Sequence, residues 1–106
     1  MSGFDEREKS FEAKFKEDQE LQFKVKARRN KLLGLWAAGK AGLSGAAAEA
    51  YAKDVVAADF QKPGDEDVVE KVVADFKAKG VKASADDVRR EMERLLPEAR
   101  RQIMAG

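Results

Sequence analysis

The sequence predicts an all-α protein, a four-helix bundle whose first helix is longer than the other three. Acid-first charge pairs recur at helical spacing along the first third of the chain, for example Asp5 with Lys9 and Glu20 with Lys24. Further along, apolar residues recur every three or four positions in three stretches, and segments that contain glycine or proline separate these stretches. At 106 residues the chain is long enough for one domain with a single modest core.

The first helix is expected over residues 4–38, a stretch without proline. At about 1.5 Å per residue it would be roughly 50 Å long, about twice the length of the later helices, so part of it must protrude. Its apolar stripe also changes phase near residues 18–20. The first stripe consists of Phe4, Phe11 and Phe15, and the second of Leu21, Val25, Arg28, Leu32 and Leu35 or Trp36. We therefore expect a protruding or mobile arm over 1–20 and a bundle domain over 21–106.

The second helix is expected to follow a connector over 39–43. Ser44 is a suitable N-cap for it, and Pro63-Gly64 is expected to stop it after about Gln61. Its inner face is expected to include Val55 and Phe60.

Two further helices complete the bundle. Asp65 is expected to cap the third and Gly80 to end it, with helix favoured over strand in its valine-rich part. Ser84 and Asp87 are spaced as a capping box for the fourth, in which Pro97 predicts a kink or an early end.

Composition argues against an enzyme. The chain contains no cysteine and no histidine, which excludes thiolate metal sites and serine–histidine arrangements, and no catalytic residues are predicted. The acidic run Asp65-Glu66-Asp67 is interpreted as a helix start rather than as a cation site, so no metal is predicted. The spacing Gly34…Gly39-Lys40 matches a phosphate-binding loop, but Ala41 stands at the magnesium-binding position and a helix precedes the segment.

Charge and hydropathy limit the kinds of partner that the chain can have. The net charge of +1 argues against nucleic acid, and no apolar run is long enough for direct membrane insertion. With no apolar signal segment, a cytoplasmic protein is expected. The charge is nevertheless uneven: residues 1–20 carry seven acids and four bases, whereas 21–31 carry five bases and no acid.

The basic segment and the arm each leave alternatives open. The segment over 24–31, followed by Trp36, is a solvated face beside a core tryptophan, a surface that docks on an acidic protein, or a site for a small anion such as a nucleotide. The phenylalanine stripe of the arm either folds back on the bundle or enters the groove of a partner. Burial of three phenylalanines would contribute roughly 5–9 kcal/mol before ordering costs.

Two blocks carry a family resemblance, Phe4-Asp5-Glu6-Arg7-Glu8-Lys9-Ser10-Phe11-Glu12-Ala13-Lys14-Phe15 and Arg28-Arg29-Asn30-Lys31-Leu32-Leu33-Gly34-Leu35-Trp36-Ala37-Ala38. With further matches at 48–60 and 64–68, the chain resembles the ζ-subunit family, the small inhibitor subunits of α-proteobacterial F1Fo-ATP synthase. It departs from the family mainly at 39–42, where the family usually continues its helix with more apolar residues.

The resemblance implies a non-catalytic regulatory subunit with a four-helix bundle. The arm of such a subunit enters a catalytic α/β interface of F1 beside the rotor γ subunit and blocks rotation in the direction of ATP hydrolysis. The implied partner-binding residues are Phe4, Arg7, Phe11, Lys14 and Phe15. No cofactor is required, but ADP or ATP is an implied ligand, with Arg28, Arg29 and Trp36 as the expected site.

The resemblance also implies a location at the inner membrane, peripheral and through F1. Two alternatives remain: a helical adaptor that uses the same stripe on another partner, and a nucleotide-sensing protein.

Overall fold

The computed structural model describes the backbone of residues 2–59 and 64–105 and the side chains of 19–59 and 64–105. The described residues form four α-helices and no strand: α1 (Ser2–Lys40), α2 (Gly45–Ala58), α3 (Glu66–Lys79) and α4 (Ala85–Ala105). The predicted all-α class and the helix over the valine-rich segment are confirmed.

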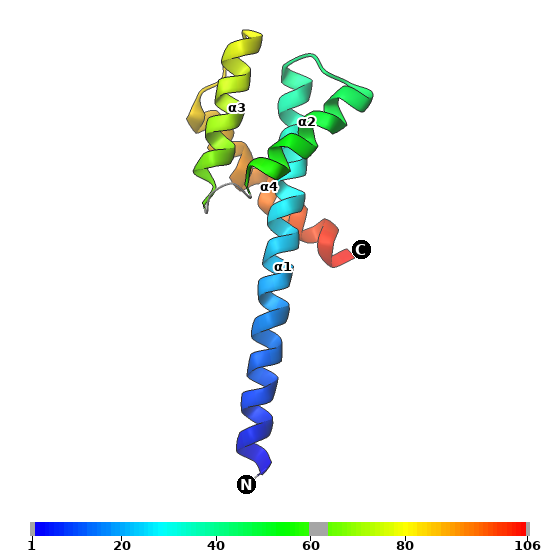
Figure 1. Cartoon of the computed structure of the whole chain (residues 1–106), viewed down its shortest axis with the longest axis vertical. Coiled ribbons are helices and arrows are strands. Elements are labelled where there is room, and N and C mark those ends of the chain that lie inside the picture. The colour runs from blue at the N-terminus through cyan, green and yellow to red at the C-terminus, as the bar shows by residue number, and fades with distance from the viewer. Residues whose placement is uncertain (1, 60–63, 106) are drawn as a thin grey trace.

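Helix α1 is much longer than its partners, as predicted. It has 39 residues, whereas α2 and α3 have 14 each and α4 has 21. Figure 1 shows that α1 packs in the bundle at its C-terminal end and extends well beyond the other helices at its N-terminal end. The molecule consequently measures 65 × 25 × 21 Å.

The core lies where the four helices meet, around the C-terminal half of α1. Each helix contributes a fully buried side chain, Leu33, Val55, Phe76 and Val88, none more than 1% exposed. The predicted inner stripe of α1 is only partly correct: Val25 is buried, but Leu32 and Trp36 are half-buried.

The most buried apolar positions of α1 are instead Leu33, Ala37 and Ala38. Helices cover α1 on more than one side, mainly α2 and α4, so its buried surface is a broad arc rather than one stripe. On a helical wheel this arc includes Leu33 and Ala37 within roughly 60° of the phenylalanine stripe. The phase change near residue 20 is therefore weaker than the prediction assumed.

Gly34 allows α1 and α2 to cross at close range. A Cβ atom at this position would lie 2.6 Å from the Cα atom of Ala52. Because only glycine lacks that atom, the backbones of the two helices can approach this closely.

Left-handed glycines end α1 and α3. Gly42 has φ +80° and Gly80 has φ +74°, and the amides that follow them bond back to the carbonyls of Ala38 and Phe76, each at 2.8 Å. The predicted stop at Gly80 is confirmed. Helix α1 runs two residues past its predicted end, so Gly34 to Lys40 is one continuous helix and not a phosphate-binding loop.

The predicted caps are correct in position but not all in chemistry. Ser44 and Asp65 occupy the N-cap positions of α2 and α3, yet neither side chain makes a capping hydrogen bond. Before α4 the capping box is confirmed: the amide of Ser84 donates to Oδ2 of Asp87 at 2.9 Å, and the amide of Asp87 donates to Oγ of Ser84 at 3.2 Å.

Pro97 does not end its helix. Helix α4 continues through Pro97 to Ala105, so an early end at the proline is wrong. Helix α2 ends at Ala58, whereas Phe60, Gln61 and Pro63 lie outside the described residues.

Candidate functional site

Helix α1 leaves the bundle near Val25. Val25 is 3% exposed and is the first buried side chain among the described residues, whereas Phe23 is 57% exposed and Lys24 is also exposed. Leu21, the predicted first residue of the bundle, is half-buried. Over residues 19–24, where side chains are described, the helix is therefore mostly exposed.

The predicted partner-binding residues lie on the protruding part of α1. They are Phe4, Arg7, Phe11, Lys14 and Phe15. Their side chains fall outside the part of the chain that the structure describes, so their role and their shared face stay predictions.

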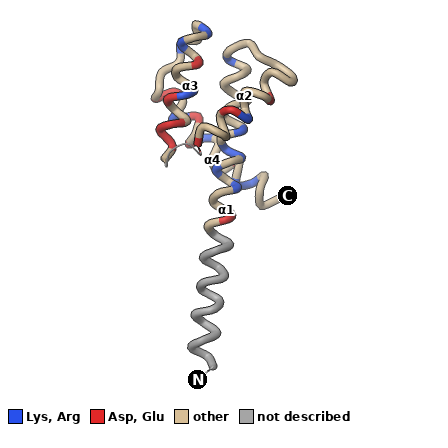
Figure 2. Tube along the Cα trace, in the orientation of Figure 1, with Lys and Arg blue, Asp and Glu red and all other residues tan. Residues whose placement is uncertain are grey.

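The basic segment divides among several environments. Lys24, Lys26 and Lys31 are exposed, Arg28 is half-buried and Arg29 is 4% exposed. Figure 2 shows Lys and Arg residues on α1 where it enters the bundle and on the last turns of α4 beside it. The segment is therefore a solvated face only in part, because one of its arginines is an interior residue.

Arg29 joins α1 to the start of α3. Its Nη2 atom lies 2.8 Å from Oδ1 of Asp65, and both its Nε and Nη2 atoms donate to Oδ1 of the buried Asn30. The hydrogen bond from Arg29 is the main reason that the pKa of the Asp65 carboxyl is held below its usual value, against the opposing effect of burial. Asp65 thus binds an arginine instead of capping its own helix.

Arg28 and Trp36 point toward other neighbours. Nη1 of Arg28 lies 3.4 Å from Oε1 of Gln102 on α4. The ring of Trp36 meets that of Phe76 edge-on, with centroids 5.8 Å apart, and the ammonium of Lys40 lies 5.1 Å from the indole centroid. The three predicted nucleotide-binding residues therefore have separate partners in this structure, and nucleotide binding stays a prediction.

A hollow of about 280 Å³ lies between α3 and α4, beside Arg29. Its apolar lining includes Val69 and Met92, and a second arginine, Arg89, lines it together with Glu66. Arg89 binds Glu66 through Nη2 at 2.9 Å. Sequence reasoning missed Arg89, because only the packing of α4 against α3 places it on the same hollow as Arg29.

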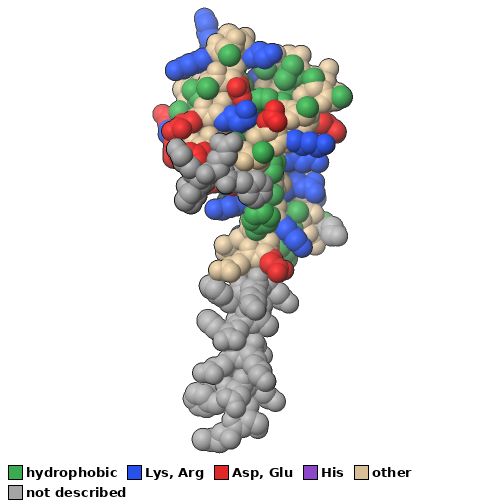
Figure 3. Space-filling model, viewed as in Figure 1, with side chains coloured by type: hydrophobic (Ala, Val, Ile, Leu, Met, Phe, Trp, Pro, Cys, Tyr) green, Lys and Arg blue, Asp and Glu red, His purple; other side chains and the backbone are tan. Residues whose placement is uncertain are grey.

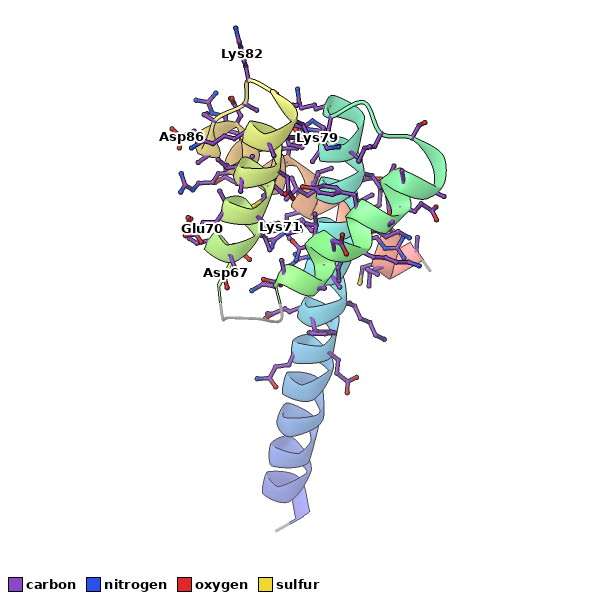
Figure 4. All side chains as sticks on the ribbon, turned by 45° about the horizontal axis from the view of Figure 1, so that its top comes forward. Asp67, Glu70, Lys71, Lys79, Lys82 and Asp86 are labelled. Carbon is purple, nitrogen blue, oxygen red and sulfur yellow. The ribbon has the colours of Figure 1, made fainter. Side chains whose placement is uncertain are left out.

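A second hollow, of about 270 Å³, lies between α2 and α3. Lys71 reaches from α3 toward α2 (Figure 4), where its ammonium lies 5.5 Å from the centroid of the Tyr51 ring. The Tyr51 hydroxyl donates to Oδ2 of Asp75 at 2.8 Å, and Lys71 binds the same oxygen at 3.2 Å. Burial, followed by the hydrogen bond to Asp75, raises the pKa of Tyr51.

Two of the three carboxylates at the start of α3 form salt bridges with arginines. Asp65 binds Arg29 and Glu66 binds Arg89. Oδ2 of Asp67 is buried without a hydrogen-bond partner among the described residues. The absence of a metal site remains a prediction.

Comparison with known proteins decides the family. A family model described as ATPase inhibitor subunit zeta matches residues 1–102. The chain belongs to this family. It is therefore classed with inhibitory, regulatory subunits of an ATPase rather than with catalytic ones.

A solved structure supports the fold of this zeta-family chain. It is described as "Solution NMR structure of the protein" and shares 47% sequence identity, with a TM-score of 0.72. The similarity covers 80% of this chain and 96% of the other. A search of curated proteins finds no match. Among the helices of the described residues, none is long and apolar enough to cross a membrane.

Proposed function

We propose that this zeta-family chain inhibits ATP hydrolysis by F1Fo-ATP synthase. In this proposal the N-terminal part of α1 enters a catalytic α/β interface of F1 beside the γ subunit and blocks rotation. The bundle stays outside and anchors the arm. The membership in an ATPase inhibitor family supports the inhibitory role.

The observation that carries the arm mechanism is the length of α1 beyond the bundle. Val25 is the first fully buried side chain of the described part, and 23 helical residues of α1 precede it. A helix of that length is about 35 Å long, enough to reach deep into a cleft between two subunits. An amphipathic helix in a groove is a common mode of protein recognition.

Deletion of residues 1–18 tests the arm. The full chain is expected to inhibit ATP hydrolysis by cognate F1, and the truncated chain to lose inhibition while keeping the helical content of its bundle. A full-length variant, Phe11→Asp with Phe15→Asp, is expected to lose inhibition as well, because both changes place charge on the stripe that the partner buries. Unchanged inhibition by the truncated chain would contradict the arm mechanism.

Capture of partners separates this function from that of an adaptor for another protein. The full chain, used as bait in an extract of its own cells, is expected to recover the α, β and γ subunits together. Recovery of a different partner without these subunits would favour the adaptor.

Binding of ADP or ATP to the bundle is a second proposal. Arg29 and Arg89 line one hollow, together with Glu93, and are paired there with Asp65 and Glu66. In this proposal the phosphate chain displaces these two carboxylates and binds both guanidinium groups.

Calorimetric titration is expected to show that the chain binds ADP and that Arg89→Ala weakens this binding. Arg94→Ala is the control, because Arg94 is an exposed arginine on the same helix, and it should leave the affinity unchanged. Equal affinities of the two variants for ADP would show that the nucleotide does not bind in this hollow.

A further inference from the structure

Two arginines meet the start of α3, and each binds a carboxylate through two hydrogen bonds. Arg29 donates to Asp65 from Nη2 at 2.8 Å and from Nη1 at 3.4 Å. Arg89 donates to Glu66 from Nε at 3.1 Å and from Nη2 at 2.9 Å. Guanidinium groups bind phosphate through the same pairs of N–H groups. The two carboxylates therefore occupy the donors that an external phosphate would use.

The two carboxylates belong to consecutive residues, Asp65 and Glu66, whose Cα atoms are about 3.8 Å apart. They are thus two negative groups joined by a short linkage, as the two phosphates of a diphosphate are. Figures 2 and 3 show acidic side chains at the surface around the start of α3. A ligand with two linked phosphate groups is consequently the natural replacement for this pair.

The two arginines differ in how readily an external anion can reach them. The side chain of Arg89 is 46% exposed, whereas that of Arg29 is 5% exposed. Nε and Nη2 of Arg29 also donate to the buried Asn30, which fixes the orientation of its guanidinium group. An anion therefore meets Arg89 first, and it reaches Arg29 only after Asp65 moves away.

The hollow that contains these pairs is not basic as a whole. Its lining carries two positive side chains, Arg29 and Arg89, and three negative ones, Asp65, Glu66 and Glu93. Among the residues that the structure describes, Glu93 forms no salt bridge. As long as the two pairs stay intact, the lining therefore repels an anion.

We propose that Asp65 and Glu66 are internal competitors for the two arginines, and that a ligand with two linked phosphate groups binds by displacing them. This inference rests on the proposed binding of ADP and adds the regulation of that site. It has an unusual consequence. A neutral residue at position 65 or 66 should strengthen binding, although it removes a salt bridge of the folded chain.

Calorimetric titration of the full chain with ADP and, separately, with inorganic pyrophosphate tests the competition. Glu66→Gln is expected to bind both ligands about three- to fivefold more tightly than wild type, because Arg89 then has an uncharged partner. Asp65→Asn should bind them about tenfold more tightly, because it releases the less exposed arginine. Pyrophosphate lacks the nucleoside, so a gain in affinity for ADP alone would contradict competition at the phosphates.

Glu93→Gln is the matched control. It removes a negative charge from the same hollow without releasing an arginine, so it should raise the affinity less than Glu66→Gln does. Glu98→Gln releases Arg101 outside the hollow and should leave the affinity unchanged. Circular dichroism checks that each variant keeps its helical content. If Asp65→Asn fails to fold, Glu66→Gln decides the question, because its salt bridge is exposed.

The outcomes separate this inference from the nucleotide site on which it rests. If neither wild type nor any variant binds ADP or pyrophosphate, both are overturned. Suppose instead that wild type binds ADP and Arg89→Ala weakens this binding. If Glu66→Gln and Asp65→Asn then bind no more tightly than Glu93→Gln, the competition alone is overturned. A loss of affinity in Glu66→Gln would overturn it as well, since the carboxylate would then hold Arg89 in place for the ligand.

Discussion

Nη2 of Arg29 lies 2.8 Å from Oδ1 of Asp65. This contact joins a buried residue of α1 to the N-cap residue of α3. The two side chains are unequally exposed, 5% for Arg29 and 44% for Asp65. The guanidinium therefore depends on this carboxylate, because water reaches it poorly.

Removal of the carboxylate should destabilise the protein. Asp65→Ala is expected to lower the free energy of unfolding by about 1–3 kcal/mol, less than for a fully buried pair because Asp65 is partly solvated. Urea denaturation followed by circular dichroism measures the change. Glu66→Ala, which removes the exposed partner of Arg89, should have a clearly smaller effect, and equal losses would show that the Arg29 contact is not special.

The same pair should make stability depend on pH. Arg29 lowers the pKa of Asp65 in the folded state from its ordinary value of 3.8. A lowered folded-state pKa stabilises the protein above the ordinary value, and this contribution is lost as the pH falls through the folded-state pKa. The stability difference between wild type and Asp65→Asn should therefore be constant near pH 7 and shrink below about pH 4. A difference that is independent of pH down to 2 would contradict this.

Substitution of two glycines in α1 should have opposite effects. Gly34→Ala is expected to destabilise the protein by about 1–3 kcal/mol, because the new methyl group would lie 2.6 Å from the Cα atom of Ala52. Gly39→Ala meets no atom within 4 Å and should be neutral or stabilise the helix by up to about 1 kcal/mol. Thermal melts of both variants provide the measurement. If Gly34→Ala is as stable as wild type, α1 and α2 lie farther apart at their crossing than the 2.6 Å distance implies.

The two serine N-caps should also differ. Ser84→Ala is expected to cost about 1 kcal/mol of stability, because its hydroxyl accepts the hydrogen bond of the Asp87 amide. Ser44→Ala should cost less, since the Ser44 side chain makes no capping bond. Equal shifts in the denaturation midpoint would argue that both hydroxyls cap in solution.

Tyr51 should ionise only under strongly alkaline conditions. It is the single tyrosine of the chain, so tyrosinate absorbance near 295 nm reports on this residue alone. Burial and the hydrogen bond to Asp75 raise its pKa above the ordinary value of 10.0. Asp75→Asn is expected to lower the titration midpoint toward that value, and an unchanged midpoint would remove Asp75 as a cause.

The helices and most of their ends could be predicted from the sequence, because local interactions determine them. The capping box of Ser84 and Asp87 and the left-handed Gly80 are examples, since each depends on residues within one or two turns. The excess length of α1 was predictable for the same reason. The family resemblance, carried by the blocks before Phe15 and around Trp36, is confirmed by the family match over residues 1–102.

The candidate site was less predictable, because its contacts join residues far apart in the sequence. The sequence suggested one site for Arg28, Arg29 and Trp36, but packing gives each a different neighbour: Gln102 on α4, Asp65 just before α3 and Phe76 on α3. Asp65 was predicted to cap α3, but its carboxylate binds Arg29 of α1 and makes no capping hydrogen bond.

The sequence by itself determined that this protein has four helices, that the first is too long for its partners, and which family it belongs to. Only the tertiary structure decided which face of α1 is buried and where the helix leaves the bundle. The physical reason is that burial depends on how α2 and α4 cover α1, with Gly34 setting the distance at one crossing. The pairing of α1 with the end of α4 follows from the same packing.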